Sequence, residues 1–94
     1  MEQEPLEDYS KRRKQKFEKF IKILSVLKDR ELTWSEMLKL ASEKNIKISE
    51  ATLSRYLRNA MNQMLVTKNI DENGRVVYSL TAKGLLFLEE FGIA

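Results

Sequence analysis

Apolar residues recur with the period of an α-helix in the first third of the chain. Five of them fall at positions i, i+3, i+4, i+7 and i+10: Phe17, Phe20, Ile21, Leu24 and Leu27. This spacing predicts a helix from about Ser10 with these side chains on one face. Ile23 and Val26 lie outside the stripe and widen it, so the helix needs more than one contact surface.

Two shorter helices are predicted next, each with a hydroxyl side chain at its start. Thr33 can cap the first, and Glu36 three residues later completes a capping box. We expect this helix to end near Asn45. Ser49 is the candidate cap of the following helix, which we expect to reach about Met64. Its apolar stripe comprises Leu53, Leu57, Ala60 and Met64.

Beyond this helix the period changes to that of β-strands. The runs LVTKNI and RVVYSL are joined by Asp71-Glu72-Asn73-Gly74, whose Asn-Gly pair suits a hairpin turn, so we expect a hairpin over residues 66–80. Thr81 can then cap a last helix, AKGLLFLEEF. The predicted fold is α+β and mainly helical: three helices, a two-stranded hairpin and a C-terminal helix over residues 10–94, after a flexible acidic tail over 1–9.

Charge is unevenly distributed, although the net charge is only +3. Residues 1–10 carry four acids, whereas residues 11–30 carry nine bases against Glu18 and Asp29. A concentrated basic segment indicates an anionic partner. The run KRRKQK, Lys11–Lys16, could be an arm along DNA phosphates. A solvated helix end explains the same run without any partner.

Several kinds of chemistry lack their usual residues. The chain has no histidine and no cysteine, which removes the commonest general base and the thiolate metal ligands. Its three glycines lie too far apart to form a phosphate-binding loop. We therefore expect no enzyme, no metal and no cofactor. No apolar run approaches a membrane span, and the acidic N-terminus is unlike a signal peptide, so a cytoplasmic protein is expected.

The polar residues of the third predicted helix gather opposite its leucine stripe. Steps of 100° from Leu53 place Arg55 and Arg58 on the far side, with Thr52 and Asn59 on one flank. Arginine can pair with guanine, asparagine with adenine, and a threonine methyl can touch thymine. Two short helices joined by a tight turn, the second bearing such residues, are typical of major-groove binding. A surface helix that is merely polar outside is the alternative, and the hairpin that follows favours DNA binding.

Two segments resemble a known family. ISEATLSRYLRNAMNQMLV resembles the recognition helix and strand entry of winged helix-turn-helix transcriptional regulators of the ArsR/MarR kind. VVYSLTAKGLLFLEEFG resembles the end of the wing and the last helix of the small archaeal members. With the helix before them, the resemblance covers residues from about 31 to 92. It implies sequence-specific binding of double-stranded DNA by a homodimer that usually represses transcription.

The pattern and the resemblance together predict the interface. The residues expected to contact bases are Ala51, Thr52, Ser54, Arg55, Arg58 and Asn59. Those expected on the DNA backbone, from the helix cap, the wing and the basic run, are Ser49, Lys68, Asn73, Arg75, Lys11, Arg12, Arg13 and Lys14. Family members commonly have glycine where this chain has Met64. Because a left-handed methionine costs about 1–2 kcal/mol, we expect the helix to leave differently here.

The surplus of apolar residues in the first and last helices suggests a two-fold dimer. Its expected interface comprises Phe17, Phe20, Ile23, Leu27, Leu85, Leu88 and Phe91. A monomer in which these residues cover the sheet is the alternative. Two other functions also remain open: a winged helix that contacts only proteins, and an architectural DNA binder without sequence preference.

Overall fold

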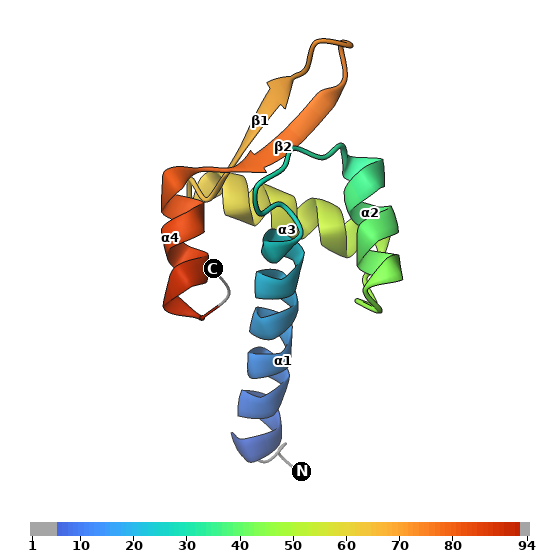
Figure 1. Cartoon of the computed structure of the whole chain (residues 1–94). Coiled ribbons are helices and arrows are strands. Elements are labelled where there is room, and N and C mark those ends of the chain that lie inside the picture. The colour runs from blue at the N-terminus through green and yellow to red at the C-terminus, as the bar shows by residue number, and fades with distance from the viewer. Residues whose placement is uncertain (1–5, 93–94) are drawn as a thin grey trace.

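A computed structural model describes residues 6–92, with side chains from Lys14 onward. The elements are α1 (Leu6–Ser25), α2 (Trp34–Glu43), α3 (Glu50–Asn62), β1 (Val66–Ile70), β2 (Val76–Leu80) and α4 (Ala82–Glu90) (Figure 1). Their order is the predicted one, and the α+β, mainly helical class is confirmed. Helix α1 begins at Leu6, so residues 6–9 of the predicted flexible tail are helical. The rest of that tail, residues 1–5, lies outside the described residues.

The core surrounds the C-terminal half of α1. In Figure 1, α2 and α4 stand on either side of α1, and α3 crosses behind the C-terminal end of α1. The hairpin extends from the top of the body, away from the N-terminal end of α1. The apolar residues that α1 and the turn after it contribute to the core are Ile21, Ile23, Leu24, Val26 and Leu27. The N-terminal half of α1 projects from the body, and the longest dimension of the molecule is 57 Å.

The starts of α2 and α3 are capped as the sequence predicts. The Thr33 backbone amide donates to Glu36 Oε1 over 2.8 Å, and the Glu36 amide donates to Thr33 Oγ1 over 3.1 Å, which completes the capping box. These hydrogen bonds hold the pKa of Glu36 below its ordinary value. Ser49 Oγ accepts a hydrogen bond from the Thr52 amide over 3.1 Å at the start of α3.

The end of α3 differs from the prediction. Met64 has φ of 62°, so the helix leaves through a left-handed residue although that residue is not glycine. The Leu65 amide donates to Ala60 O over 2.8 Å and the Met64 amide donates to Met61 O over 3.0 Å, which is a Schellman motif. The side chain is 71% exposed and Leu65 is buried. Burial of Leu65 and the two hydrogen bonds offset the backbone strain at Met64.

The hairpin is antiparallel and pairs Val66 with Leu80 at its base and Ile70 with Val76 near its tip. Leu32, between α1 and α2, bridges Tyr78 with hydrogen bonds in both directions. Tyr78 pairs with Lys68 at the middle of the ladder, so this bridge joins the middle of the hairpin to the segment that enters α2. The hairpin is thus fixed to the body as far as its middle, and its far end extends into solvent (Figure 1).

Candidate nucleic-acid interface

Helix α3 presents a polar face to solvent and buries the opposite one. Leu53, Leu57 and Ala60 are at most 2% exposed, as the apolar stripe predicts. Met64, the fourth predicted member of that stripe, follows the helix and lies in solvent. The residues predicted to contact bases share the outer side: Ala51, Ser54, Arg55, Arg58 and Asn59 are exposed and Thr52 is half-buried. The helix therefore offers these side chains together over about two and a half turns.

A chain of hydrogen bonds orders the first part of this face. Ser49 Oγ donates to Thr52 Oγ1 over 2.9 Å, and Arg55 Nη2 donates to the same oxygen over 3.2 Å. The guanidinium of Arg55 is thus held along the helix towards its start. A guanidinium has five N–H donors, so most of those on Arg55 stay available to an acceptor outside the protein. Arg58 makes no hydrogen bond or ion pair among the side chains that the structure describes.

Tyr56 fixes α3 against α1, a contact that the sequence analysis did not anticipate. Its ring packs edge-on against Phe20 with centroids 5.5 Å apart, and its hydroxyl donates to Lys16 O over 3.5 Å. Tyr56 stands three residues after Leu53, and this helical spacing was the signal in the sequence that could have placed it beside the buried stripe. In the structure its side chain is half-buried there. The orientation of the polar face relative to α1 depends on this contact.

The hairpin tip is ordered by Asp71. Its Oδ1 accepts hydrogen bonds from the Asn73 and Arg75 amides, each over 2.9 Å, and its Oδ2 accepts one from Arg75 Nε over 2.8 Å. The hydrogen bond from the Arg75 amide is the largest cause of the lowered pKa of Asp71. Gly74 has φ of 77°, the conformation that the Asn-Gly turn predicts. Arg75 therefore reaches solvent as a member of an ion pair, not as a free cation.

The rest of the hairpin surface is mixed in character. Lys68 and Asn73 are exposed, as a role on the DNA backbone requires. Ile70 and Val76 are also exposed, at 71% and 43%, and form the cross-strand pair nearest the tip. The sequence analysis treated both as strand residues without asking whether a core reaches them. The hairpin extends beyond the body, so no core covers this pair.

The basic run lies in the projecting half of α1. Lys14 is exposed, and the side chains of Lys11, Arg12 and Arg13 lie outside the described residues. Their segment is helical and belongs to the part of α1 that extends from the body (Figure 1). The role of this run on phosphates remains a prediction.

The predicted dimer surface needs correction. Ile23, Leu27 and Leu88 are at most 1% exposed because they fill the core of a single subunit, so their side chains are not available to a partner. Phe20 and Leu85 are half-buried. The apolar surface that remains consists of Phe17, Leu86 and Phe91, which are 41%, 60% and 44% exposed.

Phe17 and Phe91 belong to an aromatic cluster between α1 and α4. Their ring centroids lie 5.1 Å apart, and each also packs against Phe87, at 6.2 and 5.1 Å. Phe87 continues the contact to Phe20, which touches Tyr56 of α3. The outer apolar surface is therefore linked through aromatic contacts to the helix that carries the polar face.

The described part of the chain has neither a membrane-spanning helix nor a cluster of carboxylates for a metal ion. No helix within residues 6–92 is long and apolar enough to cross a membrane. No group of three or more Asp or Glu side chains there is arranged to hold a metal ion.

Solved structures of known proteins are similar to this chain, whereas comparisons of its sequence with known families and proteins find no match. No protein-family model matches it, and no curated protein matches it in sequence. A PadR family transcription regulator from Clostridium difficile has a TM-score of 0.71 and 25% identity over 79% of this chain and 82% of its own. A PadR-like transcription factor from Bacteroides fragilis has the same TM-score and identity over 89% and 85%. The ferric uptake regulator of Vibrio cholerae has a TM-score of 0.60 and 26% identity over 69% and 52%.

These similarities confirm the winged helix-turn-helix fold. In this fold α2 and α3 form the helix-turn-helix, and the β1–β2 hairpin is the wing. Two of the three similar structures are transcription regulators of the PadR type, and the third is a ferric uptake regulator with DNA-binding domains. They are of the PadR and ferric uptake types, so the narrower resemblance to ArsR/MarR regulators and to small archaeal members stays a prediction.

Proposed function

We propose that this protein is a transcription regulator that binds double-stranded DNA in a sequence-specific manner, with α3 in the major groove. The observation that carries this proposal is the outer face of α3, where Arg55, Arg58 and Asn59 stand together on a helix whose opposite face is buried. The similarity to transcription regulators of the same fold supports it.

The groups on this face suit base recognition. The N–H donors of Arg58 and the free donors of Arg55 match the two acceptors of guanine, and the Asn59 amide matches adenine. Ala51 and Ser54 are small, so the helix can approach the base edges closely. Ser49 and the free amides at the start of α3 are suited to a phosphate of the backbone.

Single alanine substitutions test the role of α3. We expect Arg55→Ala and Arg58→Ala each to weaken binding to a selected operator by about 1–3 kcal/mol and to relax the base preference at one position. Arg30→Ala removes an exposed arginine outside both α3 and the wing, so it is the matched control and should change affinity little. Fluorescence anisotropy on the operator and on random duplexes measures both effects. Equal weakening on all sequences would make these residues phosphate contacts and the protein an architectural DNA binder.

The wing supplies backbone contacts in this proposal. Lys68, Asn73 and Arg75 are exposed along the hairpin, and Arg75 keeps N–H donors beyond the one bonded to Asp71. We expect Arg75→Ala to reduce the slope of log affinity against log salt by at most about 1, since its charge is already partly neutralised. An unchanged slope would remove Arg75 from the interface.

A homodimer completes the proposal. Phe17 and Phe91 are exposed and in contact and form an apolar patch between α1 and the end of α4, and Leu86 is a further exposed apolar residue of α4. A second copy is the partner that we propose for this surface. Two recognition helices about 34 Å apart would then read a pseudo-palindromic site, most simply as a repressor that blocks transcription. Sedimentation of Phe91→Asp and Leu86→Asp variants tests this, since both should become monomeric. A wild-type monomer at all concentrations would contradict it.

A second function has one observation in its favour. Ile70 and Val76 form an exposed apolar pair on the wing, where a phosphate-binding surface would carry polar side chains. This pair suits a winged helix that contacts another protein. Absence of DNA binding even at low salt would favour that function over the first.

A further inference from the structure

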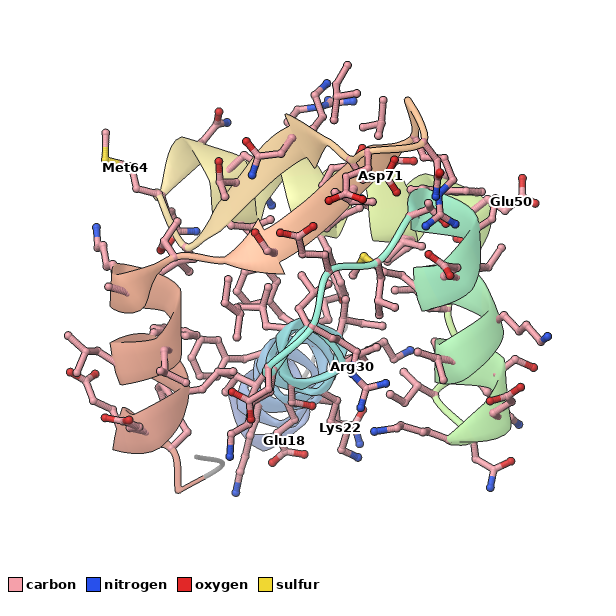
Figure 2. All side chains as sticks on the ribbon, turned by 45° about the horizontal axis from the view of Figure 1, so that its top comes forward. Glu18, Lys22, Arg30, Glu50, Met64 and Asp71 are labelled. Carbon is pink, nitrogen blue, oxygen red and sulfur yellow. The ribbon has the colours of Figure 1, made fainter. Side chains whose placement is uncertain are left out.

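A groove of about 500 Å³ lies between α1 and the turn that joins α2 to α3. Four lysines line it: Lys19 and Lys22 from α1, and Lys44 and Lys47 from the turn. Glu18 is the only acidic residue in its lining. Figure 2 labels Glu18 and Lys22 on α1, which is seen nearly end-on there. Residues more than twenty positions apart in the chain are thus brought to one concave surface.

The charge of this groove is not balanced by the protein. Its nine lining residues carry four positive charges and one negative, a net of +3, which equals the net charge of the whole chain. None of the four lysines forms an ion pair with a carboxylate whose side chain the structure describes. Like charges that face each other across a groove repel, and an anion between them removes that repulsion.

Helix ends alone do not explain this arrangement. Lys22 lies in the last turn of α1, and Lys44 follows the last residue of α2, where each interacts favourably with the negative end of a helix dipole. That effect accounts for each lysine separately. The dipole effect does not require the two helix ends to present their lysines to the same groove, whose lining includes a single acidic residue.

We propose that this lysine groove is a binding site for phosphate groups. The ammonium groups of lysine act as mobile point charges with three donors each, which suits the several oxygens of a phosphate chain. Gln15, Ser25 and Asn45 in the lining add neutral polar groups that can orient such a ligand. The volume lies within the range of small-molecule sites. The phosphates could belong to a free polyphosphate-type ligand or to the backbone of bound DNA, and the chemistry of recognition is the same.

The position of the groove connects it to the recognition helix. Lys47 stands two residues before Ser49, the cap of α3. A second groove, between α2 and the same turn, also includes Lys47 and extends to Ser49 and Glu50. A phosphate in the lysine groove therefore contacts the segment that sets where α3 begins. Occupancy of the groove should alter the amide signals of Lys47 and Ser49.

The first test uses inorganic triphosphate and no DNA, so it does not depend on the proposed DNA binding. We expect calorimetry at low salt to show one site per chain, and the double variant Lys22→Gln/Lys47→Gln to lose at least tenfold in affinity. The control Lys39→Gln/Lys83→Gln has the same net charge but removes exposed lysines outside the groove, and should bind as the wild type does. Equal loss in both double variants would show general charge attraction and would overturn the site.

The second test identifies the source of the phosphates. If DNA fills the groove, Lys22→Gln/Lys47→Gln should reduce the salt slope of duplex binding by up to about 2, and triphosphate should compete with the duplex. If a free ligand fills it, the slope stays unchanged and triphosphate still binds to the DNA complex. Either result supports a phosphate site. No triphosphate binding together with an unchanged slope overturns it.

Discussion

The Thr81 hydroxyl donates a hydrogen bond to the carbonyl oxygen of Met64 over 2.6 Å, across the width of the hairpin base. Thr81 Oγ1 also accepts a hydrogen bond from the Gly84 amide over 2.9 Å and so caps α4. The Thr81 amide in turn donates to Leu65 O over 3.0 Å. One residue therefore ties the exit of α3 to the start of α4. The direction in which the wing leaves α3 depends on it.

Substitution of Thr81 tests this tie. Thr81→Ala removes the cap and the bond to Met64, so we expect it to lower the free energy of unfolding by about 1–2 kcal/mol. For a domain of this size that is a fall in Tm of about 4–8 °C for each kcal/mol. Thr81→Ser keeps the hydroxyl and should retain most of the stability. If the serine variant is as unstable as the alanine variant, the hydroxyl is not the group that matters.

Met64 should be a site of easy stabilisation. Its φ of 62° is strained for a residue with a Cβ, and its side chain is 71% exposed, so little packing is lost on removal. Met64→Gly relieves about 1–2 kcal/mol of backbone strain in the folded protein. It also raises the conformational entropy of the unfolded chain, which lowers the free energy of unfolding by about 0.4–1 kcal/mol. We expect a net gain of about 1 kcal/mol, measured by chemical denaturation.

Alanine at the same position is the control for Met64→Gly. Met64→Ala keeps the Cβ, and therefore the strain, so it should not stabilise the protein. Equal stability of the glycine and alanine variants would mean that the left-handed backbone at residue 64 is not strained in solution.

Most of the fold could be predicted from local signals in the sequence. Thr33, Ser49 and Thr81 each precede a helix and cap it, since a hydroxyl that satisfies free amides acts within one turn of chain. The Asn73-Gly74 pair marks the hairpin turn for a similar reason. The outward face of α3 followed from its leucine stripe, because a helix with one buried face leaves its other face exposed.

The exit of α3 was predicted wrongly because two kinds of energy compete there. The preference of methionine against a left-handed backbone is local and can be read from the sequence. The hydrogen bonds from Thr81 to Met64 and Leu65 join residues 17 and 16 positions apart, and Leu65 is buried in the core. Such contacts appear only once the chain is folded, and here they outweigh the local preference.

The dimer surface was mispredicted for a related reason. A helical stripe does not say whether Ile23 or Leu88 is covered by its own subunit or by a partner, and the structure covers both within the subunit. The ion pair between Arg75 and Asp71 was not anticipated, because it forms only once the turn brings the two side chains together. The lysine groove also depends on contacts between distant segments. Base contacts on α3 and phosphate contacts on the wing remain predictions.

Gly84 is expected to tolerate no side chain. A Cβ at this position would overlap the carbonyl oxygen of Leu65, which is backbone and cannot swing away. Alanine normally stabilises a helix by about 1 kcal/mol relative to glycine, but the overlap should outweigh this gain and leave Gly84→Ala less stable by roughly 1–3 kcal/mol. Lys83→Ala, at the exposed neighbouring position, should stay within about 0.5 kcal/mol of the wild type. Thermal unfolding compares the two, and a Gly84→Ala protein at least as stable as Lys83→Ala would contradict the close approach of α4 to Leu65.

The wing tip should lose its order in acid at a pH set by Asp71. The hydrogen bonds from Arg75 and Asn73 hold the pKa of this carboxylate below its ordinary value of 3.8. Because the folded pKa is the lower one, the contribution of Asp71 to stability is present above about pH 3.8 and is lost as the pH falls through the folded pKa. We therefore expect the amide signals of Asn73 and Arg75 in an NMR titration to move together with a midpoint below pH 3.8.

The variant Asp71→Asn isolates this titration. Asparagine keeps a carbonyl oxygen that can accept from the two amides but has no ionisable group, so the signals of Asn73 and Arg75 should no longer move with that midpoint. Loss of the charge also releases Arg75 from its ion pair, and the salt slope of DNA binding should then rise towards the full contribution of one cation. A wild-type midpoint at or above pH 3.8 would show that the turn does not favour the ionised carboxylate. In that case Asp71 does not restrain Arg75 in solution, and the wing offers DNA a free positive charge.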